Sequence, residues 1–323
     1  MRPFWLQQAL DSAQEAVCPP LQGDTRCDVC IVGGGYTGLW TALMLKEAVP
    51  ALDVVLIEAD ICGAGASGRN GGCALSWSAK YFTLERLFGA AEAVRLVRES
   101  ERSIADIGVF CAANGIDCDY RLDGTLYTAT NAAQVGATDA VIAALEHKGI
   151  NSFRRLPLEQ VQRLAGSGRH LEGWFSPAAA TVQPGKLVRG LRRVALQRGV
   201  RLYEGTAMTG LEHGAPVQVR TAHGTLRADR VVLGLNAWMA RVFPQFERSV
   251  AIVSSDMVIT EPCPELLRQI GLDSGISVLD SRIFVHYYHN TSDGRLMLGK
   301  GGNTFAYGCL LYTSDAADDT PCV

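Results

Sequence analysis

The chain has 323 residues, of which 48% are hydrophobic and 20% charged, and its formal net charge is −3 at pH 7. This composition is typical of a globular protein with an apolar core, and the charge balance excludes the basic stripe that nucleic-acid binding requires. No apolar run of about 18 residues occurs, so no membrane span is predicted. The N-terminal residues lack the basic start and apolar block of a signal peptide, and we expect a cytoplasmic protein.

The ten cysteines are scattered without a common spacing, which argues against a disulfide framework in a chain of this length. Cys27 and Cys30 form a C-x-x-C pair at the start of an apolar run. A zinc site would need a second pair, which the sequence lacks, and the six histidines show no metal-ligand spacing. We therefore expect no metal site, and we expect both thiols to be partly buried residues that pack like apolar side chains.

Residues 27–58 carry the most informative pattern. Residues 27–32 are typical of a buried parallel strand, residues 39–48 favour a helix, and residues 53–57 predict a second apolar strand. A G-x-G-x-x-G motif separates the first strand from the helix, and an acidic residue ends the second strand. In such a unit the glycines allow a tight turn and a close approach of pyrophosphate, while the acid accepts hydrogen bonds from a ribose diol. The motif residues that predict a dinucleotide site are Gly33, Gly35, Gly38 and Glu58.

A second glycine-rich stretch, GASGRNGG at residues 65–72, follows the second strand. An NAD-binding domain would usually continue here into another crossover helix, whereas a glycine-rich loop favours close contact with a large planar ligand. Gly71 and Gly72 would let backbone amides approach a flavin ring, and Ser67, Arg69 and Asn70 can bond phosphate, ribitol or flavin heteroatoms. The sequence therefore favours FAD as cofactor, with an NAD-dependent dehydrogenase as the alternative.

The remaining sequence alternates helix and strand patterns. Residues 83–115 favour helices, residues 119–130 predict a hairpin that turns at Asp123-Gly124, and residues 131–148 suit a helix. Residues 187–198 predict an amphipathic helix, and we expect the arginines from Arg189 to Arg201 to form a solvated face. Strands separated by turns are predicted within 200–213, 216–224, 225–235, 281–289 and 294–299.

The two glycine motifs, in DVCIVGGGYTGLWTALML and IEADICGAGASGRNGG, resemble those of the D-amino-acid oxidase and glycine oxidase family of flavoproteins, nearest to its γ-glutamylputrescine oxidase-like members. The resemblance implies an α/β fold (α+β overall), in which a Rossmann-like FAD-binding domain with a parallel sheet is interwoven with a mostly antiparallel substrate-domain sheet. We expect discontinuous domains: residues 1–80 and 150–245 for FAD binding, and residues 81–149 and 246–307 for the substrate or cap domain.

The same resemblance implies oxidation of a C–N bond in an amine or amino acid, with oxygen or another electron acceptor as the second partner. Hydride would pass to flavin N5 and leave an imine that water hydrolyses. Met208 falls where relatives bind adenine through the backbone, and Asn236 falls where the chain returns to the cofactor. Tyr287 and Tyr288 are candidate substrate walls, and Arg282 and Arg295 are candidate partners of a substrate carboxylate.

The end of the sequence departs from the family pattern. The family would continue after residue 307 with a strand, a glycine-rich loop and a helix that points at the flavin. Residues 308–323 show neither a strand nor a helix period. We therefore expect a non-native tail on a C-terminally truncated chain, and an inactive fragment of a flavoenzyme is a further alternative.

Overall fold

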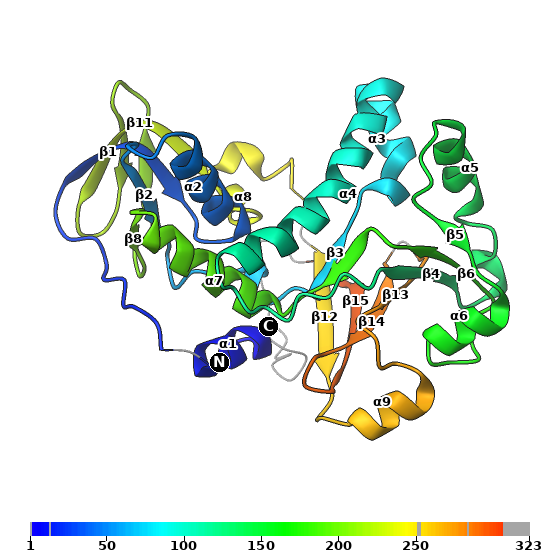
Figure 1. Cartoon of the computed structure of the whole chain (residues 1–323). Coiled ribbons are helices and arrows are strands. Elements are labelled where there is room, and N and C mark those ends of the chain that lie inside the picture. The colour runs from blue at the N-terminus through cyan, green and yellow to red at the C-terminus, as the bar shows by residue number, and fades with distance from the viewer. Residues whose placement is uncertain (1, 13, 251–252, 283, 306–323) are drawn as a thin grey trace. The chain divides into compact units, whose positions relative to one another are not determined.

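The structure is a computed structural model that describes residues 2–12, 14–250, 253–282 and 284–305 (Figure 1). The chain divides into two compact units. Unit 1 is built mainly from residues 1–70 and 184–254, and unit 2 from residues 71–183 and 255–303. The predicted tail at residues 308–323 lies outside the described residues. None of the helices in the described part of the chain combines the length and apolar content needed to cross a membrane.

Unit 1 contains a six-stranded sheet with a parallel centre. Four neighbouring strands run parallel, and two antiparallel strands extend one edge. The sheet confirms the two strands predicted around the glycine motif and the strands predicted between residues 200 and 235. Its order is β8 (Arg201–Tyr203), β2 (Val54–Ile57), β1 (Thr25–Val32), β11 (Thr225–Leu233), β10 (Val217–Arg220) and β9 (Gly210–Glu212).

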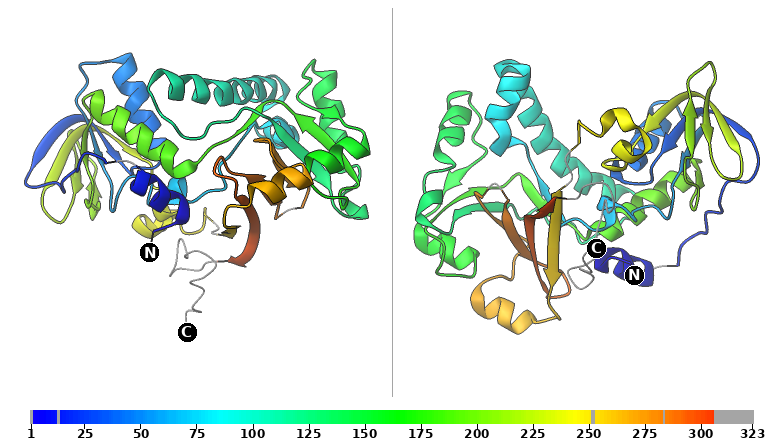
Figure 2. Two further views of the ribbon diagram at one scale, coloured as in Figure 1. Left: turned by 60° about the horizontal axis from the view of Figure 1, so that its bottom comes forward. Right: turned by 180° about the vertical axis from the view of Figure 1, so that it is seen from behind.

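The helices of unit 1 include the crossover helix α2 (Tyr36–Ala48), which confirms the predicted strand–glycine–helix–strand order. Helix α1 (Phe4–Ser12) lies alongside α7 (Pro184–Gln197), where Gly185 leaves room for the backbone of Trp5 (Figures 1 and 2). The short elements are η1 (Ala66–Gly68), α8 (Trp238–Val242) and η4 (Pro244–Phe246).

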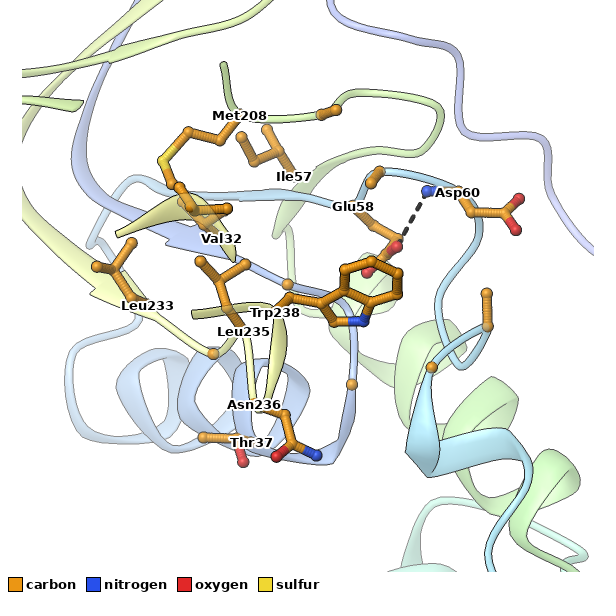
Figure 3. Close-up of a pocket in the computed structure, with 18 of the residues that line it drawn as sticks. Val32, Thr37, Ile57, Glu58, Asp60, Met208, Leu233, Leu235, Asn236 and Trp238 are labelled. Carbon is orange, nitrogen blue, oxygen red and sulfur yellow. Dashed lines mark hydrogen bonds between the residues drawn. The ribbon is translucent and has the colours of Figure 1, made fainter. Parts of the chain in front are cut away.

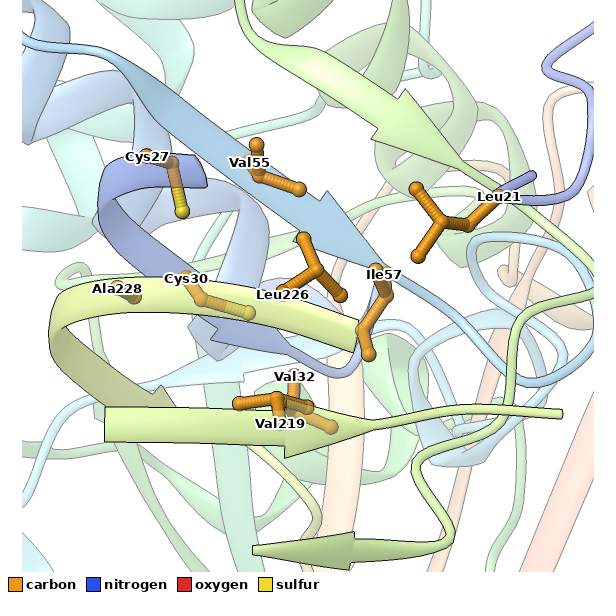
Figure 4. Close-up of a cluster of buried hydrophobic side chains, with 9 residues drawn as sticks. All are labelled: Leu21, Cys27, Cys30, Val32, Val55, Ile57, Val219, Leu226 and Ala228. Atoms are coloured by element: carbon orange, nitrogen blue, oxygen red, sulfur yellow. The ribbon is translucent and has the colours of Figure 1, made fainter. Parts of the chain in front are cut away.

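The core of unit 1 lies against the sheet and holds apolar side chains from four strands (Figure 4). Cys27 and Cys30 belong to this cluster and are 3% and 0% exposed, so the two thiols are core residues and are buried more deeply than predicted. Burial raises the pKa of Cys27 to about 11, because the apolar surroundings disfavour the thiolate. The cluster consists of Leu21, Cys27, Cys30, Val32, Val55, Ile57, Val219, Leu226 and Ala228.

Unit 2 is built around a mostly antiparallel seven-stranded sheet. The pair β13 with β4 is parallel. Strand β14 is antiparallel to β13 and β15, and strand β6 is antiparallel to β4 and β5. Together with unit 1 this confirms the predicted fold class. The order is β12 (Val253–Ile259), β15 (Leu296–Phe305), β14 (His286–Asn290), β13 (Ser277–Asp280), β4 (Thr125–Ala129), β6 (Glu172–Ser176) and β5 (Arg154–Arg155).

A two-stranded sheet, five α-helices and two 3-10 helices complete the described part of unit 2. The predicted helical stretch at residues 83–115 forms two helices, and the neighbouring strands β14 and β15 are antiparallel. The elements are β3 (Cys73–Leu75), β7 (Ala179–Thr181), η2 (Ser78–Lys80), η3 (Ala132–Gln134), α3 (Tyr81–Phe88), α4 (Ala90–Ala113), α5 (Asp139–His147), α6 (Leu158–Leu164) and α9 (Pro264–Ile270).

Three expectations are wrong. The predicted hairpin at residues 119–130 does not form, because β4 pairs with β6 and β13 and the Asp123 carboxylate accepts the Gly275 N–H at 2.7 Å. The predicted helix at residues 131–148 is interrupted at Gly136, whose φ of +77° is not helical. Finally, Arg189 and Arg192 on α7 do not face solvent: they are 6% and 2% exposed.

Candidate functional site

A cavity of about 1040 Å³ opens in unit 1 at the carboxyl ends of the parallel strands (Figure 3). Its walls come from the turn after β1, the loop after β2, residues 206–209, and the segment from the end of β11 to α8. Ligands of open α/β sheets bind at this end of the strands, because loops and helix N-termini converge there. The cavity is therefore the candidate cofactor site.

The glycine turn after β1 forms one wall of the cavity. Gly33 has a φ of +111°, and its N–H donates to Ile57 O at 2.8 Å, which joins the turn to the end of β2. Gly38 does not line the cavity but packs so tightly that a Cβ there would lie 1.9 Å from Gly33 O. The glycines thus bring the first turn of α2 directly against the sheet.

The N-terminus of α2 faces an oxygen atom from the second glycine-rich stretch. Tyr36 N–H donates to Ser67 Oγ at 2.9 Å, and a Cβ on Gly35 would lie 3.0 Å from the same oxygen. Gly35, Tyr36 and Ser67 all line the cavity. A helix N-terminus binds oxygen ligands through its unpaired N–H groups and positive dipole end. The two glycine-rich stretches therefore meet around a position suited to a phosphate oxygen.

Glu58 follows β2 and lines the cavity (Figure 3). Its carboxylate accepts the Gly34 N–H at 2.7 Å and the Asp60 N–H at 3.0 Å. Burial raises the pKa of Glu58, and these two backbone hydrogen bonds oppose that shift by stabilising the charged form. A carboxylate fixed by backbone donors keeps further lone pairs for a diol, so its placement suits recognition of a ribose.

Arg69 and Asn70 are tied to their own loop. Arg69 lines the cavity, and its Nη2 donates to Ala64 O at 2.5 Å. Asn70 is not among the lining residues; its side-chain amide donates to Ala66 O at 3.1 Å and Ser67 O at 3.0 Å. Asn70 therefore stabilises the turn that presents Ser67 to α2.

The far wall of the cavity is more apolar and contains the residue predicted at the adenine and the residue predicted where the chain returns to the cofactor. Met208 and Asn236 line it, and Asn236 adopts a φ of +48° at the turn after β11. Trp238 and Arg241, which the sequence reasoning missed, line it as well, with the Arg241 guanidinium 5.8 Å from the Trp238 ring centroid. Their proximity to Asn236 in the sequence could have pointed to them, since both belong to the short helix α8 that begins two residues after Asn236. A flat apolar wall beside a carboxylate suits a purine followed by its ribose.

Four predicted site residues belong to unit 2 and do not line this cavity. Gly71 leaves room for an aromatic ring, because a Cβ there would lie 2.3 Å from Tyr287 Cε2. The buried His289 places Nε2 2.9 Å from Gly71 O, and Gly72 O accepts the Val182 N–H at 2.8 Å. Within unit 2, Gly71 thus has a packing role beside Tyr287.

Tyr288 points away from its neighbour, as the alternation of a strand requires. Its hydroxyl donates to Ala165 O at 2.6 Å and lies 3.0 Å from His170 Nε2, and its ring packs against the apolar cluster around Leu126. The side chain of Tyr288 therefore has a structural position in the core of unit 2.

Comparison with known proteins assigns the family. The chain matches the family described as "DAO: FAD dependent oxidoreductase" over residues 28–321. The protein belongs to the DAO family of FAD-dependent oxidoreductases. FAD is the cofactor of this family, which agrees with the cavity geometry and favours FAD over the NAD alternative.

Two curated relatives show what share of a relative's length this chain covers. It is 33% identical to gamma-glutamylputrescine oxidoreductase of Escherichia coli (strain K12), over 85% of this chain and 64% of the relative. It is 32% identical to probable oxidoreductase OrdL of Rhizobium meliloti (strain 1021), over 88% of this chain and 66% of the relative. The chain thus spans slightly less than two thirds of the length of these relatives.

Solved structures share the fold. The glycine oxidase from Geobacillus kaustophilus matches with a TM-score of 0.66 and 21% identity, over 90% of this chain and 75% of that protein. The L-amino acid deaminase from Proteus vulgaris matches with a TM-score of 0.66 and 22% identity, over 89% of this chain and 63% of that protein. At these identities the likeness establishes the architecture alone.

Proposed function

We propose that this protein oxidises the C–N bond of an amine or amino acid with FAD as its redox cofactor. The observation that carries the proposal is the cavity of unit 1, where the glycine turn, the N-terminus of α2 and Glu58 converge. Membership of the DAO family supports the reaction class. Unit 1 would then be the FAD-binding domain and unit 2 the substrate domain.

The residues of the cavity divide into three roles. Backbone N–H groups at Gly35 and the first turn of α2, with Ser67 and Arg69, would hold the pyrophosphate. Glu58 would accept hydrogen bonds from the adenosine ribose, and the wall that contains Met208 would contact adenine. Bound FAD supplies a hydride acceptor for the carbon next to the substrate nitrogen, and the resulting imine is hydrolysed by water.

The ion pairs of the two candidate arginines favour an amine substrate over an amino acid. Arg282 lies 2.6 Å from the Asp280 carboxylate, and Arg295 lies 2.9 Å from the Asp293 carboxylate. Both candidate cations are thus already paired, whereas recognition of a substrate carboxylate uses an arginine that can form a two-point contact. Of the two candidate aromatic residues, Tyr287 remains the proposed substrate wall, because the hydroxyl of Tyr288 is committed to the core.

An absorbance spectrum followed by anaerobic titration tests the proposal. The purified chain should show flavin absorbance that bleaches when a suitable amine is added and returns with oxygen or an artificial acceptor. Glu58→Ala should lose flavin while remaining folded by circular dichroism. A folded protein that binds NADH tightly and no FAD would refute the cofactor. Retention of FAD without bleaching by any amine or amino acid would refute the substrate class and favour an inactive fragment.

A further inference from the structure

Four charged side chains lie together inside unit 1, at the end of the sheet where the cavity opens. Glu15 follows α1, Arg189 and Arg192 project from α7, and Glu204 directly follows β8. The side chains of Arg189, Arg192 and Glu204 are 6%, 2% and 8% exposed. Burial of ions is costly unless each is paired, so the arrangement requires an explanation. We call these four residues the Glu204 cluster.

The contacts of the Glu204 cluster explain how the charges are tolerated. Glu204 Oε2 lies 2.8 Å from Arg192 Nη2, while Glu204 Oε1 accepts hydrogen bonds from Arg192 Nε and Arg189 Nη1, each at 2.9 Å. Glu15 pairs with both arginines from the other side. Two carboxylates balance two guanidinium groups, so the cluster is neutral overall. Although burial alone would raise it, the pKa of Glu204 is lowered, chiefly by the hydrogen bond from Arg192.

The Glu204 cluster also binds both backbone polar groups of Cys62, its N–H and its C=O. Cys62 N–H donates to Glu204 Oε1 at 2.8 Å, and Cys62 O accepts from Arg189 Nη1 at 3.0 Å. The next residue donates its N–H to Gly34 O at 3.1 Å, and the Cys62 side chain fills the space that a Cβ on Gly34 would need. Cys62 is therefore fixed between the buried charges and the glycine turn.

Cys62 stands in the middle of the loop that supplies one cavity wall. Glu58 and Asp60 line the cavity just before it, and Ser67 and Arg69 line it just after. The chain after Glu204 is joined to the same loop, because Gly205 N–H donates to Asp60 O and Thr206 N–H donates to Glu58 O, both at 2.7 Å. The buried charges thus act on the loop without reaching the cavity themselves.

We propose that Glu204, held by Arg189 and Arg192, is a positioning residue for FAD: through the backbone of Cys62 it fixes the loop that carries Glu58 and Ser67. This inference rests on the proposed function. It assigns the cluster a role in cofactor affinity beyond its contribution to folding. Because the ribose and phosphate contacts depend on this loop, a small loss of order there weakens FAD binding.

The main variant replaces the buried pair without leaving an unbalanced charge. Arg192→Met with Glu204→Met keeps a similar side-chain volume and leaves Glu15 paired with Arg189, and such replacements are often well tolerated by the fold. The matched control is Asp53→Met with Arg201→Met. Arg201 stands at the opposite end of the same strand β8 and pairs with Asp53 at 2.6 Å, away from the cavity walls. The first double variant removes the Arg192–Glu204 pair together with the Arg192–Glu15 and Arg189–Glu204 pairs, whereas the control removes the Arg201–Asp53 pair. Each double variant removes one positive and one negative charge.

Three measurements are made on each full-length variant: FAD affinity by flavin fluorescence, thermal unfolding without FAD, and amide hydrogen exchange of residues 59–69. The Arg192/Glu204 double variant should raise the Kd for FAD about tenfold or more and speed exchange in residues 59–69 while the protein stays folded. The Asp53/Arg201 double variant should leave the Kd within about twofold of wild type, whatever its melting temperature. Glu204→Gln, which places an amide N–H against Arg192, should also raise the Kd for FAD. It replaces the Arg192/Glu204 double variant in the test if that double variant does not fold.

The outcomes separate this inference from the proposed function. Wild-type FAD affinity in the folded Arg192/Glu204 double variant would overturn the inference and leave the proposed function intact. Equal weakening by both double variants would also overturn it, because the effect would then be general destabilisation. A wild-type chain that binds no FAD would overturn the proposed function, and this inference with it.

Discussion

The tight contact between Gly38 and Gly33 leads to a specific prediction for Gly38→Ala. A Cβ on Gly38 would lie 1.9 Å from Gly33 O, whereas real Cβ atoms stay at least 3.0 Å away, so α2 must move by about 1.1 Å. The contact atom is a backbone oxygen and cannot rotate away. Overpacking of this kind costs about 1–3 kcal/mol, and alanine returns about 1 kcal/mol through its higher helix propensity. We expect a net loss of up to about 2 kcal/mol in the free energy of unfolding.

Gly65→Ala is the matched control, because it lies in the other glycine-rich stretch and a Cβ there meets no atom within 4 Å. Its φ of −78° is one that alanine adopts readily, so its stability should equal or slightly exceed that of wild type. The assay is urea unfolding without FAD, followed by FAD titration. The Gly38 variant should also bind FAD at least about tenfold more weakly, since its helix N-terminus has shifted. Equal stability and FAD affinity of the Gly38 variant and wild type would show that the turn adapts and that the packing argument is wrong.

Two further predictions concern Glu58 and Gly71. Because burial raises the pKa of Glu58, FAD affinity should fall as the pH is lowered through a value above the ordinary glutamate pKa of about 4.3. Protonation of Glu58 removes the charge that strengthens the ribose contact. Glu58→Gln should therefore bind FAD about tenfold more weakly, and its FAD affinity should not change over this pH range. If the affinity of Glu58→Gln still falls with pH, another group titrates there. Gly71→Ala should destabilise unit 2 by about 1–3 kcal/mol in urea unfolding, because its Cβ would lie 2.3 Å from the Tyr287 ring. Tyr287→Leu in the same chain should restore part of the loss, and an unchanged unfolding midpoint in Gly71→Ala would contradict the contact.

The sequence predicted the elements whose signals are local. The strand, glycine turn, helix and second strand around Gly33 depend on spacing within some thirty residues, and the structure confirms their order. The position of Glu58 at the cavity followed from the same spacing. Tyr287 and Tyr288 were both named as candidate substrate walls, but they are neighbours on one strand, and the alternation of a strand places their side chains on opposite faces.

Long-range pairing accounts for what the sequence did not predict. Asp123-Gly124 has the composition of a hairpin turn, yet β4 takes its partners from residues 172–176 and 277–280. Arg189 and Arg192 are buried because Glu15 arrives from a distant part of the chain and Glu204 from the end of the next strand, and a helical periodicity argument treats an arginine as solvated. Gly71 packs against the ring of Tyr287, which is likewise far from it in the sequence.

The position of β1 in its sheet has a consequence for synthesis of the protein. One edge of β1 pairs with β2, which follows within the same segment, but its other edge pairs with β11, which is made only after residues 71–183 have left the ribosome. Until then the nascent chain carries an open strand edge rich in valine and isoleucine, the kind of surface that recruits chaperones or self-associates. Slow translation before β11 has emerged from the ribosome should therefore increase aggregation of this chain, whereas slowing after β11 has emerged should not.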